Sequence, residues 1–184
     1  MAEAAAITLK RRGTLDRRSD AINGVSLQPA RPARRISLRA RPDGLAPLSL
    51  ALSLDLPTKP KTSSTANDRS ALWLGPDEWL VIDDGEGDPV ADLAEVSVLH
   101  SAVDVSHRNA AIIVSGEKAA DVINAGCPQD LGMQAFPVGA CSRTVLGKIE
   151  IVLLRTSPDT FRVECWRSFA DYAFSYLSDA ARGV

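Results

Sequence analysis

The sequence contains few of the residues that bind metals, form disulfides or act as nucleophiles. Its 184 residues include two histidines and three cysteines, and Cys127, Cys141 and Cys165 are too widely spaced to form a Cys-x-x-Cys pair. Structural zinc is therefore not expected. An odd, sparse set of cysteines is typical of buried thiols in a reducing compartment, so we expect a cytoplasmic protein.

Long apolar runs and nucleotide-binding motifs are also missing. The sequence has no run of about 18 apolar residues, which a membrane-spanning helix would need, and its first residues lack the apolar core of a signal peptide. It contains no GxxxxGK[ST], GxGxxG or GxSxG motif. We therefore expect no membrane segment, no dinucleotide bound by this chain alone and no hydrolase nucleophile.

The charge is distributed unevenly along the chain. Residues 1–43 carry a net charge of +6 and the remainder carries −8, although the whole chain has a formal charge of only −2. The arginines scattered over residues 31–41, together with several Pro and Gly residues in the first part, predict a basic arm over residues 1–45, extended or bound to a partner. The arm could serve as a nucleic-acid tail, but it lacks a dense basic run and the acidic remainder would repel a polyanion, so no nucleic-acid partner is expected.

The remaining sequence, 46–184, contains enough apolar residues for one core and predicts a single α+β domain. Alternating leucines predict a strand over 48–56, the polar stretch 57–70 predicts a loop, and Gly75-Pro76-Asp77-Glu78 predicts the turn of a hairpin over 70–83. Further strands are expected at 102–106, 110–114, 140–146, 149–154 and 161–166, and helices at 88–96, 117–125 and 168–182. This order predicts an antiparallel sheet with helices packed on one face.

The stretch 102–116 joins two predicted strands through a polar turn. One interpretation makes His107 a general base that Asp104 orients. Residues three apart on a strand point to opposite faces, however, so the two side chains would meet only if the strand ends at Ser106. The alternative, which we favour, is a turn whose side chains bond to nearby backbone or contact a partner.

Five other side chains offer binding groups. Arg143 or Arg167 could hold a carboxylate of a ligand or partner, or could pair with acids of this chain. Trp73 and Trp79 could stack on a flat ligand, anchor an interface or simply fill the core, as could Trp166. Residue chemistry alone predicts no self-contained active site.

Four short motifs in order resemble one known family. They are LGPDEWL at 74–80, DVSHR at 104–108, CPQDL at 127–131 and RSFA at 167–170, and the stretch 137–144 follows the same pattern. Together they are similar to the gamma subunits of heterotetrameric sarcosine oxidases. GPDEW, and DVSH followed by a strand and Ser-Gly, are also similar to the folate-binding domain of the glycine-cleavage aminomethyltransferase.

The resemblance implies a non-catalytic subunit with an aminomethyltransferase-like fold. Such a complex oxidises sarcosine with O₂ and tetrahydrofolate to glycine, H₂O₂ and 5,10-methylenetetrahydrofolate. FAD, FMN, NAD and tetrahydrofolate are expected in the large subunits and zinc in the smallest. This chain would bind none of them and would contact mainly the large alpha subunit, beside beta and delta subunits. No catalytic, cofactor-binding or metal-binding residue is expected in it.

The sequence is compatible with two other functions. The chain could be the equivalent subunit of an N-methylglutamate dehydrogenase, or a free-standing folate-binding module with a pocket near Trp79 and Arg143. For the subunit interpretation, the predicted contact residues are polar or aromatic and lie at the predicted turns and strand ends. They are Trp73, Asp77, Glu78, Trp79, His107, Arg108, Arg143 and Arg167.

Overall fold

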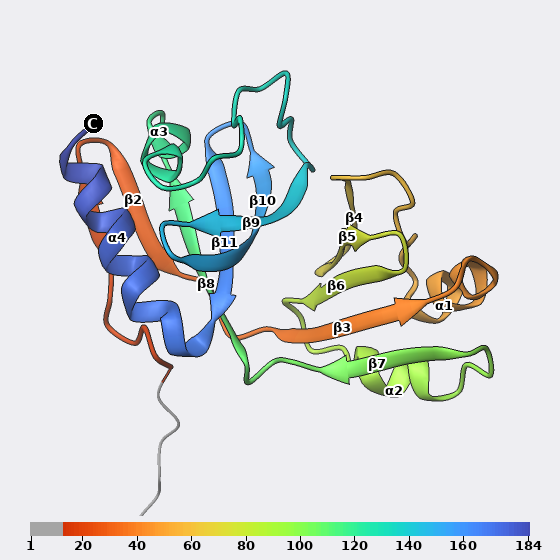
Figure 1. Cartoon of the computed structure of the whole chain (residues 1–184). Helices are drawn as coiled ribbons and strands as arrows, with labels where there is room; N and C mark the ends of the chain where they lie inside the picture. Colours follow the sequence, from red (N-terminus) through yellow and green to blue (C-terminus); the bar gives the residue numbers. More distant parts are fainter. Residues whose placement is uncertain (1–12) are drawn as a thin grey trace, which may run out of the picture.

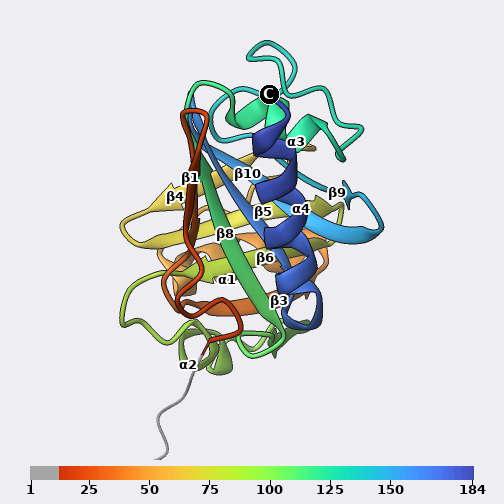
Figure 2. The same ribbon diagram turned by 90° about the vertical axis from the view of Figure 1, so that its left-hand side faces the viewer.

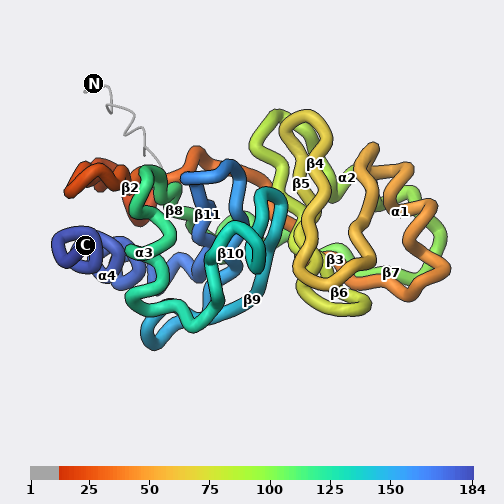
Figure 3. The backbone as a smooth tube through the Cα atoms, turned by 90° about the horizontal axis from the view of Figure 1, so that it is seen from above, coloured from red at the N-terminus to blue at the C-terminus, as the bar shows by residue number. Residues whose placement is uncertain are grey.

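The computed structural model describes residues 13–184 and divides their strands between two antiparallel sheets. The sheets pack against each other, and helices cover the outer face of each, so the layers run helix, sheet, sheet, helix (Figures 1 and 3). In Figure 2 the strands of one sheet run across those of the other. The predicted α+β class with antiparallel pairing is confirmed, but the strands form two sheets instead of one.

The six-stranded sheet contains most of the C-terminal half of the chain. Its strands, in spatial order, are β1 (Asp20–Ile22), β2 (Val25–Pro29), β8 (Asn109–Ser115), β11 (Thr160–Trp166), β10 (Ile149–Ser157) and β9 (Cys141–Leu146). Helices α3 (Ala119–Asn124) and α4 (Ala170–Arg182) cover its outer face, and a 3₁₀ turn, η2 (Arg167–Phe169), leads into α4. The largest apolar cluster lies between this sheet and these helices.

The five-stranded sheet has its own helical cover. Its strands, in spatial order, are β4 (Ser63–Ala66), β5 (Arg69–Gly75), β6 (Glu78–Asp83), β3 (Arg34–Ala40) and β7 (His100–Asp104). The 3₁₀ turn η1 (Pro42–Gly44) leads into α1 (Leu45–Leu52), which contacts α2 (Pro89–Ala94), and a second apolar cluster includes residues of both helices.

A third, smaller apolar cluster lies between the two sheets. Alternation along β6 sends Trp79 and Val81 toward the helices and Leu80 and Ile82 toward the other sheet. The same period holds in β11, where the predicted split is confirmed: Phe161, Val163 and Cys165 join the outer cluster, whereas Arg162, Glu164 and Trp166 do not. The face of β11 turned toward the second sheet is therefore polar, and this face positions the candidate site.

The predicted arm over residues 1–45 is wrong for the part that the structure describes. Residues 20–40 form β1, β2 and β3, and Val25, Leu27, Ile36 and Leu38 are fully or almost fully buried. The prolines that suggested an arm fall where strands can accept them: Pro29 ends β2 and Pro32 lies between strands. Residues 1–12 lie outside the described residues.

The predicted strand over 48–56 is also wrong, because its first half is helix α1. Leu48 and Leu52, one helical turn apart, are buried, whereas Leu50 is 82% exposed on the opposite side. Ser53 then adopts a left-handed conformation with φ of 50°, which ends the helix. Leucine favours helices, and the every-second-residue pattern hid the helical one.

The predicted loop over 57–70 contains a further strand. β4 pairs with β5 through a turn at Asn67, whose φ is 53°. The predicted hairpin over 70–83, the helices near 88–96, 117–125 and 168–182, and the later strands are confirmed with small shifts at their ends. Asp88 caps α2, accepting a hydrogen bond from the amide of Ala91, as its position before a proline predicted.

Across residues 13–184, no helix combines the length and apolar character needed to cross a membrane.

Candidate functional site

The stretch 102–116 carries the chain from one sheet to the other. β7 ends at Asp104 in the five-stranded sheet and β8 begins at Asn109 in the six-stranded sheet. Val105, only 5% exposed, lies between the sheets, and its amide donates a 2.8 Å hydrogen bond to the carbonyl of Arg35. The crossing segment therefore fixes the two sheets relative to each other.

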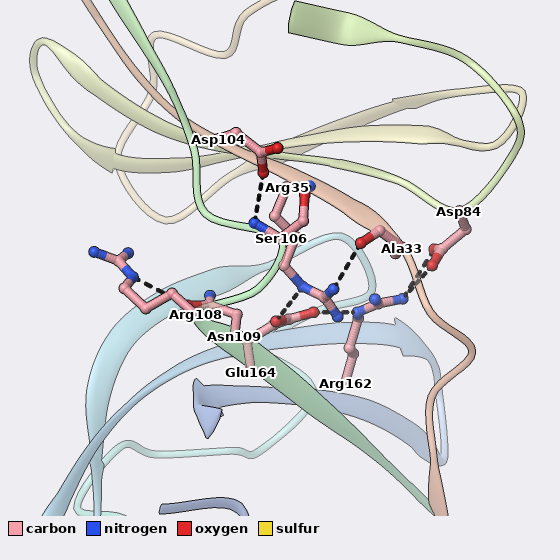
Figure 4. Close-up of polar contacts among 9 residues, drawn as sticks. All are labelled: Ala33, Arg35, Asp84, Asp104, Ser106, Arg108, Asn109, Arg162 and Glu164. Carbon is pink, nitrogen blue, oxygen red and sulfur yellow. Dashed lines mark hydrogen bonds and ion pairs between the residues drawn. The ribbon is translucent and has the colours of Figure 1, made fainter. Parts of the chain in front are cut away.

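Polar side chains of this segment bond to nearby backbone. The Asp104 carboxylate accepts a 2.8 Å hydrogen bond from the amide of Ser106, and the Ser106 hydroxyl accepts one of 2.9 Å from the amide of Arg35 (Figure 4). Hydrogen bonding by the Ser106 side chain and backbone lowers the pKa of Asp104. Asp104 thus stabilises the turn, as the favoured interpretation predicted. In a catalytic pair its carboxylate would have to bond to the imidazole of His107, but it bonds to the amide of Ser106, and His107 is exposed.

A buried ionic network links the facing sides of the two sheets (Figure 4). Glu164 of β11, only 1% exposed, accepts a 2.7 Å hydrogen bond from Nε of Arg35 on β3 and a 2.8 Å bond from Nε of Arg162. Arg162 also donates bonds of 2.8 and 3.0 Å to the carboxylate of Asp84, and Arg35 donates a 2.9 Å bond to the carbonyl of Ala33. Two positive and two negative groups therefore balance at this junction.

The network favours the charged form of Arg162 in spite of its burial. Burial opposes the charge on Arg162, but the nearby carboxylates of Glu164 and Asp84 more than offset this effect, and the pKa of Arg162 is raised. Buried charges are tolerated when they are paired and hydrogen-bonded. These charged groups thus help to hold the two sheets together.

A second ionic cluster spans the sheets near the surface. Arg143 of β9 pairs with Glu78 of β6, and Glu78 also pairs with Arg39 of β3 at 3.0 Å. Asp77 lies 3.7 Å from Arg39. Of the two interpretations of Arg143, the structure shows the one in which it pairs with an acid of this chain. Contact of Asp77, Glu78 and Arg143 with a partner stays a prediction.

The two tryptophans of the hairpin face each other across β5 and β6. Trp79 is only 1% exposed, and its indole N–H donates a 2.7 Å hydrogen bond to the carbonyl of Pro57. Trp79 is therefore a core residue, and its prediction as a contact residue is wrong because alternation along β6 turns it inward. Trp73 is half-buried and packs against the same cluster.

The folate-pocket alternative does not fit this region. Trp79 and Arg143 do line one hollow, but its volume is only about 40 Å³. Ligand pockets for drug-sized molecules typically have volumes of about 300–1,000 Å³. A pterin ring therefore has no room beside these two side chains in this structure.

The structure brings together three other predicted contact residues, His107, Arg108 and Arg167. All three are exposed, and the amide of Arg167 donates a 2.7 Å hydrogen bond to the carbonyl of Arg108. His107 and Arg167 line a cleft of about 630 Å³ between residues 13–16 and the two segments in which the chain crosses between sheets. Trp166 lies beside them and is 46% exposed, and the guanidinium of Arg108 lies over its ring, 5.8 Å from the centroid.

The cysteines are buried, as their composition suggested, and burial raises the pKa of Cys141 and Cys165 to about 12. Within residues 13–184 no three His, Cys, Asp or Glu side chains are grouped as metal ligands would be. Sequence reasoning missed the roles of Arg35, Arg162 and Glu164. The only sequence signal for the last two was the placement of two charges on one face of a strand.

Comparison with known proteins places the chain in one family. Residues 39–183 match the sarcosine oxidase, gamma subunit family. The sarcosine oxidase subunit gamma of an Arthrobacter species is 32% identical over 155 residues, which cover 80% of this chain and 75% of that protein. The subunit gamma of Corynebacterium sp. strain P-1 is 30% identical over 163 residues, which cover 85% of this chain and 79% of that protein.

Solved structures agree. A chain of the heterotetrameric sarcosine oxidase of Corynebacterium sp. U-96, solved in complex with pyrrole 2-carboxylate, aligns with a TM-score of 0.85 and 26% identity over 94% of this chain and 95% of that chain. The glycine cleavage system aminomethyltransferase T of Bartonella henselae shares the fold, with a TM-score of 0.63 and 15% identity over 86% of this chain and 46% of the other. The family match, the relatives and the fold all lead to one assignment: this chain belongs to the gamma subunit family of heterotetrameric sarcosine oxidase.

Proposed function

We propose that this chain is a non-catalytic subunit that docks mainly on the large alpha subunit of its oxidase and stabilises the assembly, with beta and delta subunits completing the complex. The partner subunits oxidise sarcosine with O₂ and pass the one-carbon unit to tetrahydrofolate. They carry FAD, FMN, NAD, tetrahydrofolate and zinc, and the complex works in the cytoplasm.

The similarity to a chain of a solved heterotetramer carries this proposal. The alignment covers 94% of this chain and 95% of that one, so the two chains correspond over nearly all of their aligned length. Two chains with the same fold present the same arrangement of strands and helices to a partner, so this chain has the backbone shape to take the corresponding place in such an assembly. The proposal therefore rests on the whole chain and not on one motif.

The internal electrostatics of the chain are consistent with a structural role. Two buried arginines, Arg35 and Arg162, form ion pairs with the buried Glu164. Arg143 forms an ion pair with Glu78. These groups fix the relative position of the sheets, which a rigid docking subunit requires. The exposed side chains of His107 and Arg108 in the crossing segment, and of Trp166 beside it, are accessible for contact with other chains.

Co-expression of this chain with the other oxidase subunits tests the proposal. We expect the tagged chain to purify with all of them, as a yellow complex that forms H₂O₂ from sarcosine. A complex prepared without this chain should keep its activity per bound flavin but dissociate at lower temperature or higher dilution. Loss of activity per flavin in an otherwise intact complex would show a catalytic role, and failure to co-purify would refute the docking role.

The same purified complex decides the substrate. We expect oxidation of sarcosine with O₂ as the electron acceptor. Preferential oxidation of N-methylglutamate without H₂O₂ would instead assign the chain to an N-methylglutamate dehydrogenase. Titration of the isolated chain with tetrahydrofolate completes the comparison, and we expect no binding because the hollow beside Trp79 holds only about 40 Å³.

A further inference from the structure

An aromatic and basic surface lies where β11 passes into α4. Trp166 and Phe169 are 46% and 39% exposed, and their rings stack with centroids 6.1 Å apart and an interplanar angle of 20°. The guanidinium of Arg108 lies 5.8 Å from the centroid of the Trp166 ring. These three side chains are called here the Trp166 platform.

The geometry of β11 explains why the fold leaves the platform uncovered. Trp166 lies on the same face of the strand as Arg162 and Glu164, which are 6% and 1% exposed because the second sheet covers them. At Trp166, two residues beyond Glu164, the second sheet no longer covers this face of the strand, and the indole is exposed to solvent. Burying stacked, rigid aromatic rings removes apolar area from water at a small cost in conformational entropy. Residues that dominate binding energies typically have this property.

Arg108 gives the platform its charge. Among residues 13–184 it forms no ion pair, and its side chain donates only a 3.3 Å hydrogen bond to Oδ1 of Asn109. Figure 4 shows it pointing away from the buried network of Arg35, Arg162 and Glu164. Glu150 lines the same hollow as Arg108 and Trp166, but it forms no ion pair with Arg108 or with any other cationic side chain among the described residues.

The arginines of the crossing region therefore differ in one respect. Arg35 and Arg162 find carboxylates within the chain, whereas Arg108 presents its forked donors beside an apolar surface without one. A forked guanidinium beside aromatic rings is complementary to a carboxylate on an otherwise apolar segment. Charge complementarity of this kind selects partners and orients them.

We propose that the Trp166 platform is a docking surface for another subunit of the oxidase, which contributes an apolar segment carrying one Asp or Glu side chain. The inference rests on the proposed function and makes it specific. The partner's apolar side chains cover Trp166 and Phe169, and its carboxylate pairs with Arg108.

Site-specific photo-crosslinking in the assembled complex tests the location of the contact. Trp166 is replaced with benzoylphenylalanine in the full chain, and Leu50, 82% exposed on α1 of the other sheet, is replaced in the same way as the matched control. We expect residue 166 to crosslink to a peptide of another subunit that contains an acidic residue, and residue 50 to give no such product. An assembled complex without a crosslink at 166 would overturn the proposal.

Charge reversal tests the carboxylate. Hot-spot side chains weaken binding about 30-fold or more when removed, so we expect Arg108→Glu to raise the dissociation constant of this chain from the complex by at least that factor. Arg41→Glu is the control, because Arg41 is also exposed and forms no ion pair within the described residues. Circular dichroism melting of both free chains checks that they fold.

The outcomes separate the two claims. Equal dissociation constants for Arg108→Glu and the unsubstituted chain would refute the docking surface while leaving the subunit assignment intact. Failure of the unsubstituted chain to join the complex would instead refute the proposed function, and the platform proposal with it.

Discussion

Replacing Glu164 with glutamine removes the buried carboxylate that two arginines share. Glu164 accepts hydrogen bonds of 2.7 Å from Arg35 and 2.8 Å from Arg162, and their side chains are only 4% and 7% exposed. The variant leaves these two guanidinium groups with only the Asp84 carboxylate, which is 42% exposed and bonded to Arg162 alone. Breaking a buried ion pair costs about 3–5 kcal/mol, so we expect a loss of that size in the free energy of unfolding.

Urea unfolding of the full chain measures this loss directly. For a chain of this size, 1 kcal/mol corresponds to about 2–4 °C in Tm, so the melting temperature should fall by roughly 6–20 °C. Glu150→Gln is the matched control, because Glu150 is an exposed acid on the adjacent strand β10 and forms no ion pair within the described residues. Its effect should stay within about 0.5 kcal/mol. A loss below about 1 kcal/mol for Glu164→Gln would refute the role given to the network.

A companion variant separates pairing from packing. The triple substitution Arg35→Met, Arg162→Met, Glu164→Leu removes all three charges and keeps similar volumes. Because the desolvation cost of a buried ionic group can equal its Coulombic gain, the triple variant should recover most of the stability that Glu164→Gln loses. A triple variant as unstable as the single one would show that the apolar cluster between the sheets cannot repack.

Three further predictions concern other parts of the chain. Gly116 has a φ of +126°, and a side chain there would collide with the carbonyl oxygen of Gly24, so Gly116→Ala should cost about 1–3 kcal/mol in urea unfolding beyond the cost of Gly24→Ala, where φ is +81° but no atom lies within 4 Å; equal losses would contradict the collision. Hydrogen bonds from the serine two positions later lower the pKa of Asp104, so its stabilising contribution is complete above its unfolded pKa of about 3.9 and is lost as the pH falls through its folded pKa; the stability difference between the wild type and Asp104→Asn should therefore shrink between pH 7 and pH 3, and an unchanged difference would contradict this. Burial raises the pKa of Cys141 and Cys165 to about 12, so iodoacetamide should leave both unmodified at neutral pH in the folded chain and alkylate both in urea, as mass spectrometry of the peptides would show; rapid labelling without denaturant would contradict their burial.

Local patterns predicted the fold after residue 70 well. The hairpin around Gly75-Pro76 and the strands β9, β10 and β11 follow from turn residues and alternation that lie next to each other in the sequence. The split of β11 into an apolar and a polar face was also correct. These features depend on neighbours within a few residues, so the sequence carries them locally.

The fold before residue 70 depends on contacts between residues that are far apart in the sequence. β3 enters the middle of a sheet between β6 and β7, whose partner residues lie about 40 to 70 positions away. Leu48 and Leu52 are buried as a helical pair although the leucines around them alternate as in a strand. Propensity cannot decide between these arrangements, because tertiary packing selects one of them.

The candidate site shows why residue type alone could not identify it. The sequence offered Arg108, Arg143 and Arg167 as equivalent contact residues and gave no reason to select Arg35. The fold separates them: Arg35 reaches Glu164, 129 residues away, and Arg143 reaches Glu78, 65 residues away, while Arg108 finds Trp166 and no acid among the described residues. An arginine with a partner in its own chain stabilises the fold, whereas one beside an exposed tryptophan and without a carboxylate offers binding energy to another chain. Which of these roles an arginine has is therefore settled by the position of acids far away in the sequence, and this is why Arg108 stands out only once the two sheets are in place.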